Sequence, residues 1–133
     1  MQGLFIPASI WEPCELRDFP TKGPDHVLLS SLYVTIGCDL VEPIYPTGDT
    51  DKSPVFADDN ACGESGNRRW FMYGDEEGRF VDQPIVNIRA TILFRYPKDV
   101  PIVGNVVLFC DSWQGASRPV PDNVLELCIK HRS

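Results

Sequence analysis

The feature that most constrains the fold is a nearly uninterrupted apolar run at residues 102–110, which Pro101 precedes and Asp111 follows. A run without an alternating polar face is typical of a β-strand that is buried on both faces. The chain has 133 residues, which is enough for one domain with its own core. The rest of the chain mixes short strands with short helices. We therefore predict a single α+β domain over residues 1–133, with two or three short helices packed on a mixed or antiparallel sheet.

Three further segments have the composition of strands. A first strand is expected at residues 4–7. Residues 10–19 contain Pro13 and are expected to form at best an edge strand or an extended arm, because proline cannot donate to a central ladder. Residues 40–45 are expected to form a short strand that Pro43 breaks.

A fourth segment gives the clearest signal for a hairpin. The aromatic-rich residues 69–73 predict a strand, and the sequence Asp-Glu-Glu-Gly at residues 75–78 predicts a turn. Gly78 is free to take a positive φ in such a turn. We expect residues 79–81 to begin the return strand of this hairpin.

The helix signal in the first half of the chain lies at residues 25–37. Leu32 and Ile36 belong to an apolar stripe with a period close to 3.6 residues, and Gly37 is suitably placed to end the helix. The β-branched residues in its last turn weaken this signal, because they lose side-chain freedom in a helix.

The second half of the chain contains two more candidate helices. Residues 88–94 are rich in β-branched residues, which favours a strand, but Asn87 could cap a helix that starts at Ile88. We favour a short helix there. A final helix is expected at residues 122–130, within a C-terminal loop and helix at residues 111–133. Residues 46–67 show no periodicity and are predicted to form one long acidic loop, a feature that is commonly functional or mobile.

The charge of the chain limits its partners. The net charge is −7 and the isoelectric point is about 4.7, which argues against general binding of nucleic acid or of an anionic membrane. The N-terminal residues have no basic region or long apolar run like that of a signal peptide. No window approaches the roughly 18 apolar residues of a membrane helix. We therefore expect a cytoplasmic protein.

The five cysteines do not suggest a metal site or a disulfide framework. No two of them form a C-x-x-C motif, and in a reducing compartment most are expected to be small core residues. Cys62 lies in a polar stretch and is the thiol most expected to be exposed. The two histidines, His26 and His131, lie far apart in the sequence. We expect neither a metal nor a cofactor.

Motifs that carry chemistry are missing from the sequence. It contains neither of the common glycine-rich phosphate-binding motifs, no H-E-x-x-H and no G-x-S-x-G elbow. A small enzyme would use acidic side chains such as Asp75, Glu77 and Asp111 near an arginine. A Ser-His or Cys-His mechanism would need His26 or His131 as its base. The sequence leans toward a protein without catalytic activity.

Arg68 and Arg69 lie next to an aromatic run and are the first candidate ligand-binding residues. Arginine beside aromatic side chains can form a surface on which bases stack. Alternatively, the aromatic side chains pack in the core and the arginines pair with the acids of the following turn. A single nucleotide is a more plausible ligand than a nucleic-acid strand, because one arginine and one aromatic platform suffice for it.

Asn87, Arg89 and Thr91 form the second candidate site, together with Trp113. The first three precede the buried strand and lie at the start of the expected helix, where backbone N–H groups could meet an anion. The alternative is that Asn87 caps the helix and Arg89 lies on the surface. Trp113 follows the strongest strand, and could line a cleft or plug the core.

Four short motifs in separate parts of the chain can be compared with those of known protein families. They are Leu4-Phe5-Ile6-Pro7, the turn from Gly74 to Arg79, Pro84 with Asn87, Arg89, Ala90 and Thr91, and the run from Ile102 to Leu108. These motifs resemble a family of small uncharacterised proteins carried by bacteriophages and mobile elements. The family has no assigned activity. What the resemblance implies is context: a phage accessory protein in the bacterial cytoplasm.

Three functions remain open from the sequence. The first is a non-enzymatic phage protein that modulates a host protein, for instance one of its defences, or sequesters a small nucleotide-type signal. The second is a small nucleotide-processing enzyme that uses Asp or Glu groups as acid and base. The third and weakest is an acidic mimic of nucleic acid. We also expect a homo-oligomer, because short edge strands often pair symmetrically.

Overall fold

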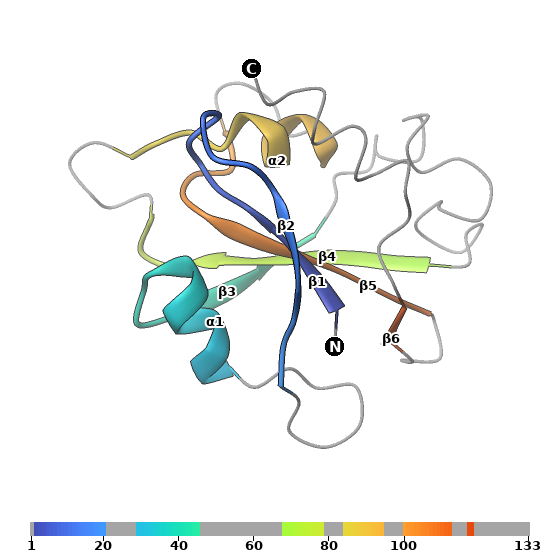
Figure 1. Cartoon of the computed structure of the whole chain (residues 1–133). Coiled ribbons are helices and arrows are strands. Elements are labelled where there is room, and N and C mark those ends of the chain that lie inside the picture. The colour runs from blue at the N-terminus through green and yellow to red at the C-terminus, as the bar shows by residue number, and fades with distance from the viewer. Residues whose placement is uncertain are drawn as a thin grey trace.

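An antiparallel sheet forms the framework of the protein (Figure 1). A computed structural model describes residues 2–20, 29–45, 68–78, 84–94, 100–112 and 117–118. The strands are β1 (Gln2–Ile6), β2 (Glu15–Asp18), β3 (Val41–Ile44), β4 (Arg68–Asp75), β5 (Val106–Ser112) and β6 (Ser117–Arg118). Their order is β2-β1-β5-β4-β3, with β6 paired to β5, and every pairing is antiparallel.

The apolar run forms the central strand β5, as its composition predicts. Val106 and Leu108 are buried on one face of the sheet, and Val107 and Phe109 on the other. The strand begins at Val106, four residues later than predicted, because Gly104 adopts a φ of +77° that turns the chain just before it. Ile102 is nevertheless buried in the core.

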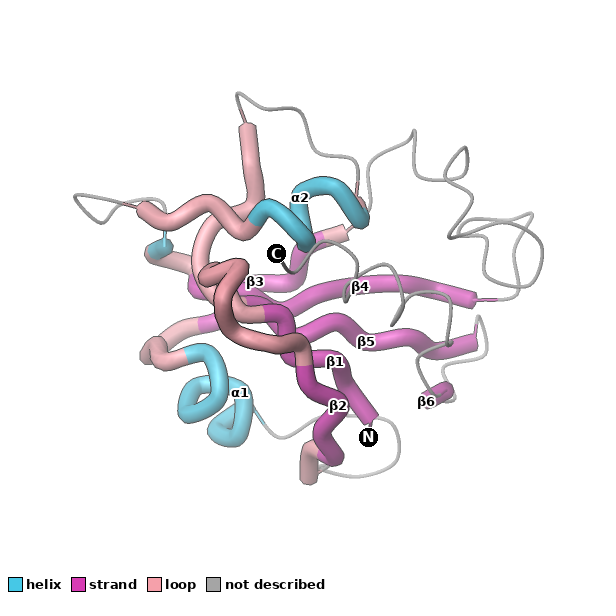
Figure 2. The backbone as a smooth tube through the Cα atoms, turned by 45° about the horizontal axis from the view of Figure 1, so that its top comes forward, coloured by secondary structure: helices cyan, strands magenta, loops and turns pink. Residues whose placement is uncertain are grey.

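One described helix covers each face of the sheet (Figures 1 and 2). Helix α2 (Ile88–Leu93) places Ala90 and Leu93 against the face that carries Leu4 and Leu108. Helix α1 (Leu29–Ile36) packs against the opposite face. The predicted α+β class is confirmed, and the sheet is antiparallel.

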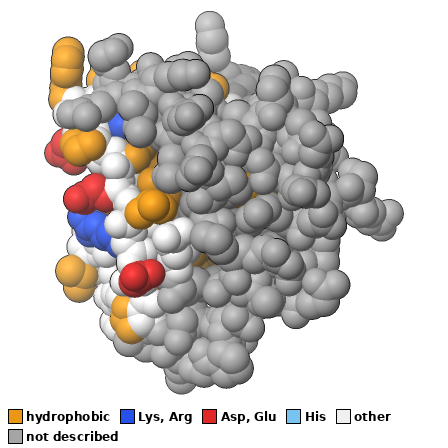
Figure 3. Space-filling model, turned by 45° about the vertical axis from the view of Figure 1, so that its right-hand side comes forward, with side chains coloured by type: hydrophobic (Ala, Val, Ile, Leu, Met, Phe, Trp, Pro, Cys, Tyr) orange, Lys and Arg blue, Asp and Glu red, His pale blue; other side chains and the backbone are white. Residues whose placement is uncertain are grey.

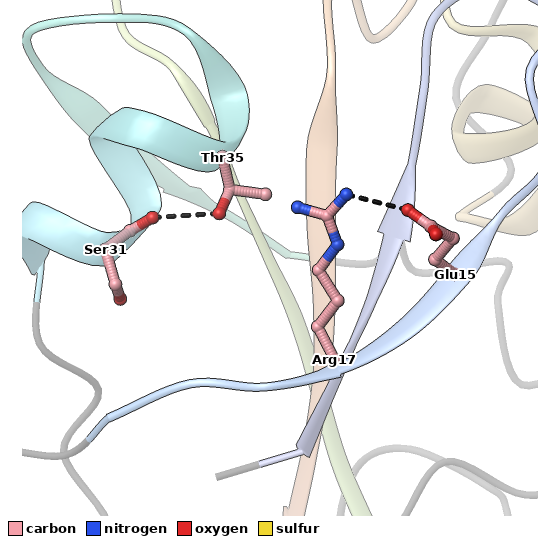
Figure 4. A network of polar contacts seen from close by, with 4 residues as sticks. All are labelled: Glu15, Arg17, Ser31 and Thr35. Carbon is pink, nitrogen blue, oxygen red and sulfur yellow. Dashed lines mark hydrogen bonds and ion pairs between the residues drawn. The ribbon is translucent and has the colours of Figure 1, made fainter.

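Helix α1 ends as its sequence predicts. Leu32 and Ile36 are buried beneath it, and Gly37 follows with a φ of +85°. The Tyr33 carbonyl accepts hydrogen bonds from the N–H groups of Gly37 at 2.9 Å and Cys38 at 3.1 Å. The Thr35 hydroxyl donates to the Ser31 carbonyl at 2.9 Å (Figure 4). Such back-bonding occupies the hydroxyl of a residue with low helix propensity.

Aromatic side chains fill the core beneath α1. The Phe109 ring stacks on Phe71, with ring centres 5.6 Å apart, and meets Phe19 and Tyr73 edge to face. On the other face Trp70 is almost fully buried. The interpretation that the aromatic run of β4 packs in the core is therefore confirmed for the side chains that the structure describes.

The two outermost strands of the described sheet are β2 and β3. Strand β2 confirms the prediction of an edge strand, with all its side chains exposed. Strand β3 continues through Pro43 instead of breaking there, because an edge strand tolerates a residue that cannot donate a hydrogen bond.

The turn at residues 75–78 is confirmed, but the pairing expected for a hairpin is wrong. The Asp75 carboxylate accepts a hydrogen bond from the Glu77 N–H at 2.9 Å, which stabilises the turn. At residues 72–74, β4 is paired with β3 on one edge and with β5 on the other, which leaves no edge free for a return strand. Gly78 does not adopt the positive φ that its position allowed.

Several predicted segments lie outside the described residues. They are the start of the first helix at residues 25–28, the acidic loop at 46–67, the return strand at 79–81, Trp113, and the C-terminal helix at 122–130. Within the portion of the chain that is described, no helix has the length and apolar character to cross a membrane.

Candidate binding site

Asn87 lies at the centre of a polar cluster that joins three parts of the chain. Its carboxamide oxygen accepts a hydrogen bond from the Ala90 N–H at 3.1 Å and thus caps helix α2. Its amide nitrogen donates to the carbonyls of Ile6 and Gly104, both at 2.9 Å. The side chain is fully buried. The predicted N-cap is confirmed, and the same group also ties the end of β1 to the chain before β5.

Thr91 is also turned toward the protein interior. Its hydroxyl donates to the Asn87 carbonyl at 2.7 Å and accepts a hydrogen bond from the Ile102 N–H at 3.0 Å. The polar groups of Asn87 and Thr91 therefore make hydrogen bonds within the chain. A role for either residue in binding a ligand stays a prediction.

Arg89 is buried, with 3% of its surface exposed, so the interpretation that it lies on the surface is wrong. Its Nη2 donates to the carbonyls of Pro7 at 2.8 Å and Ser9 at 2.9 Å. Its Nε and Nη1 are buried and make no hydrogen bond with the described residues. The guanidinium thus binds backbone carbonyls of the β1–β2 connection, and its predicted ligand role is untested.

A second amide holds the start of this connection. The Asn105 carboxamide oxygen accepts a hydrogen bond from the Ala8 N–H at 2.9 Å. Its amide nitrogen lies 3.4 Å from the Ile36 carbonyl at the end of α1. Three side chains from the second half of the chain, Asn87, Arg89 and Asn105, therefore hold the backbone at Ile6 to Ser9.

The connection then makes a tight turn at residues 9–12, which we call the Trp11 turn. The Ser9 carbonyl accepts a hydrogen bond from the Glu12 N–H at 3.2 Å, in addition to the one from Arg89. The Ser9 hydroxyl accepts from the Trp11 N–H at 3.3 Å. Trp11 is 79% exposed at this turn, and Glu12 and Pro13 are exposed beside it.

Sequence reasoning did not single out Trp11 as a functional residue. A signal was present, because a tryptophan lies between Pro7 and Pro13, near the start of the segment expected to form an edge strand or an extended arm. Exposed aliphatic side chains also flank the buried Asn87 and Arg89: Ile85, Val86, Ile88 and Ile92. Their segment and the β1–β2 connection lie side by side, joined by the hydrogen bonds of Arg89 (Figures 1 and 2).

The other predicted ligand-binding residues belong to a different region. Arg68 and Arg69 lie at the start of β4, opposite Ser112 and Asp111 of β5. Their side chains, and all of Trp113, lie outside what the structure describes. The structure therefore brings Asn87, Arg89 and Thr91 together but does not test their grouping with Arg68, Arg69 and Trp113.

The acids proposed for catalysis lie in two places. Asp75 and Glu77 share the turn after β4, where the Glu77 N–H donates to the Asp75 carboxylate at 2.9 Å. In the sheet, the backbone of Asp111 in β5 lies opposite that of Arg69, near the start of β4. Asp75 is the last residue of β4. Six residues of extended chain separate residues 69 and 75, which is about 20 Å. The backbone positions of Asp75 and Asp111 are therefore far apart along the sheet. Among the described residues, no group of three or more metal-binding side chains is assembled.

The Cys38 thiol lies just after helix α1 in a partly buried position. Burial raises its pKa above the ordinary value of 9.0, and the nearby Asp75 and Asp39 carboxylates raise it further. A hydrogen bond with the backbone of Leu40 acts in the opposite direction. Cys38 is therefore a poor nucleophile at neutral pH, where the thiolate is scarce.

Comparison with known proteins adds no relative to this description. No family model matches the chain, and neither a curated protein nor a solved structure matches it. The site must therefore be interpreted from its own geometry.

Proposed function

We propose that this protein is a non-enzymatic binding protein that docks onto another protein through the Trp11 turn. The observation that carries the proposal is a tryptophan with 79% of its surface exposed, on a turn that a buried arginine holds in place. Tryptophan is among the residues that contribute most to binding energy at protein interfaces. A single exposed apolar residue needs no explanation, so the proposal depends on how the turn is held.

The hydrogen bonds of the turn support a role in binding for the exposed Trp11 side chain. The backbone from Pro7 to Glu12 receives bonds from Arg89 and Asn105 and closes the turn internally. A loop that is ordered before binding loses less conformational entropy in the complex. Exposed Ile85 and Ile88 lie on the neighbouring segment and could widen the contact.

The chemistry of the turn indicates the kind of partner. An apolar pocket that accepts the indole, with basic groups at its rim for Glu12, would match both the shape and the charge. The resemblance to phage proteins supports a bacterial host protein as the partner and the host cytoplasm as the compartment. That part of the proposal rests on sequence motifs alone.

The test compares two substitutions of exposed apolar residues. Immobilised wild-type protein, Trp11→Ser and Val34→Ser are each incubated with bacterial lysate, and the captured proteins are quantified by mass spectrometry. Val34 is the matched control, because it is 85% exposed on helix α1, across the sheet from α2. We expect proteins that wild type and Val34→Ser retain and Trp11→Ser loses.

The Kd of a purified partner is then measured for wild type and for Trp11→Ser. Loss of an interfacial tryptophan that carries at least about 2 kcal/mol raises Kd roughly 30-fold. Equal capture or equal Kd for wild type and Trp11→Ser would refute the proposal. Heat released on titration with nucleotides would instead favour sequestration of a small ligand.

A further inference from the structure

Strand β2 has one edge that no described strand of the chain occupies. It pairs with β1 on one side, in a register that places Leu16 opposite Leu4 and Arg17 opposite Gly3. Its other side faces no strand among the described elements. All four of its side chains are exposed. The backbone groups on such an edge are a template for an additional strand.

The charges along β2 are arranged symmetrically about Leu16. Glu15 and Arg17 lie on the same face of the strand, and their side chains form an ion pair at 2.7 Å (Figure 4). The Arg17 guanidinium also lies 4.8 Å above the ring centre of Phe5. Leu16 projects to the opposite face and is 44% exposed. An acidic and a basic group thus flank a central leucine.

We propose that β2 pairs with β2 of a second copy of this chain, antiparallel, about a two-fold axis at Leu16. Each Leu16 then faces its counterpart on one face of the sheet. On the other face, Glu15 of each copy lies opposite Arg17 of its partner. The two sheets join into one, and the ion pairs within each strand are replaced by ion pairs between strands. Opposite charges across an antiparallel pair stabilise it.

The same charges disfavour other registers. If the two-fold axis moves by one residue, to Glu15 or to Arg17, that residue faces an identical charge, which is destabilising. The other edge strand, β3, contains Pro43, which lacks the N–H that pairing needs.

Figure 3 shows acidic, basic and hydrophobic side chains intermixed on the described part of one face, without a large patch of one charge.

The experiment exchanges the two charges separately. Glu15→Arg gives β2 two basic side chains at these positions, and Arg17→Glu gives it two acidic ones, so each variant alone would oppose like charges across the axis. We expect sedimentation equilibrium of the full chain at physiological salt to show a dimer for wild type. Each variant should have a dimer dissociation constant raised at least about tenfold.

Mixing the variants provides the decisive measurement. An equimolar mixture of Glu15→Arg and Arg17→Glu restores unlike charges across the axis, so the two should form a heterodimer. Glu76→Arg, which makes the same charge change at an exposed turn beyond β4, should dimerise like wild type. A monomeric wild type, or a mixture that stays monomeric, would overturn the proposal. Trp11→Ser should dimerise normally, which separates this interface from the docking surface.

Discussion

Arg89 shows how one residue can hold a distant backbone segment. A buried guanidinium is expensive to desolvate, and here it contacts two neutral carbonyls, at Pro7 and Ser9, both 2.9 Å or less away. These two carbonyls lie in the connection between β1 and β2, outside the strand pairing of the sheet. A neutral side chain of similar length, such as methionine, could fill the space but could not donate to them.

At the same scale, the environment of Cys38 makes a prediction about its reactivity. Burial and the Asp75 carboxylate both disfavour the thiolate and raise the pKa. The rate of alkylation at Cys38 increases as the thiol loses its proton, and we expect this increase at a higher pH than for a free thiol. Asp75→Asn should shift this increase to lower pH. Asp39→Asn should shift it less, because the Asp39 carboxylate has the smaller effect on the Cys38 pKa. Mass spectrometry of the peptide that contains Cys38 measures the rate, and equal profiles for wild type and Asp75→Asn would contradict the prediction.

At the scale of elements, α2 depends on contacts outside itself. A helix of six residues is too short to be stable alone. It is fixed by the buried Ala90 and Leu93 and by the cap at Asn87, whose amide also reaches β1 and the Gly104 turn. One side chain therefore connects a helix, a strand end and a turn.

Two substitutions of Asn87 separate its capping role from its bridging role. Asn87→Ala removes both and should lower the free energy of unfolding by about 3 kcal/mol, the sum of a lost cap and unsatisfied buried carbonyls. Asn87→Asp keeps an oxygen for the Ala90 N–H but cannot donate to Ile6 and Gly104. We expect it to be at least as destabilised as Asn87→Ala in urea denaturation. Wild-type stability of Asn87→Asp would show that only the cap matters.

At the scale of the whole molecule, the two proposed surfaces are separate parts of one hairpin. The Trp11 turn lies at one end of β2, and the proposed dimer uses the strand itself. In an antiparallel pair the two Trp11 turns would therefore lie at opposite ends of the joined strands. Such a dimer could hold two copies of a partner at once and gain avidity if both sites are engaged.

Dimerisation also predicts how thermal stability depends on concentration. If the folded state is a dimer and the unfolded state a monomer, mass action raises Tm as the protein concentration increases. We expect this rise for wild type and a much smaller one for Arg17→Glu. Differential scanning calorimetry at several concentrations measures it. A wild-type Tm that is independent of concentration would count against a dimer that forms in the folded state.

Local pattern was enough to predict most of the described elements. The burial of β5 on both faces follows from its run of apolar residues, and the ends of α1 and α2 follow from Gly37 and Asn87. The predicted hairpin after β4 failed because the choice of strand partner is not local. Strand β3, far earlier in the sequence, occupies the edge that a return strand would need.

The sequence by itself determined roughly where most of the described strands and helices form, because these depend on periodicity, capping residues and glycine conformations within a few positions. Only the tertiary structure decided what Asn87 and Arg89 do. The carbonyls they bind, at Ile6, Pro7 and Ser9, lie 80 to 82 residues away along the chain. A short polar stretch looks the same in sequence whether it faces solvent or a distant strand end, and only the packed sheet brings those partners within reach.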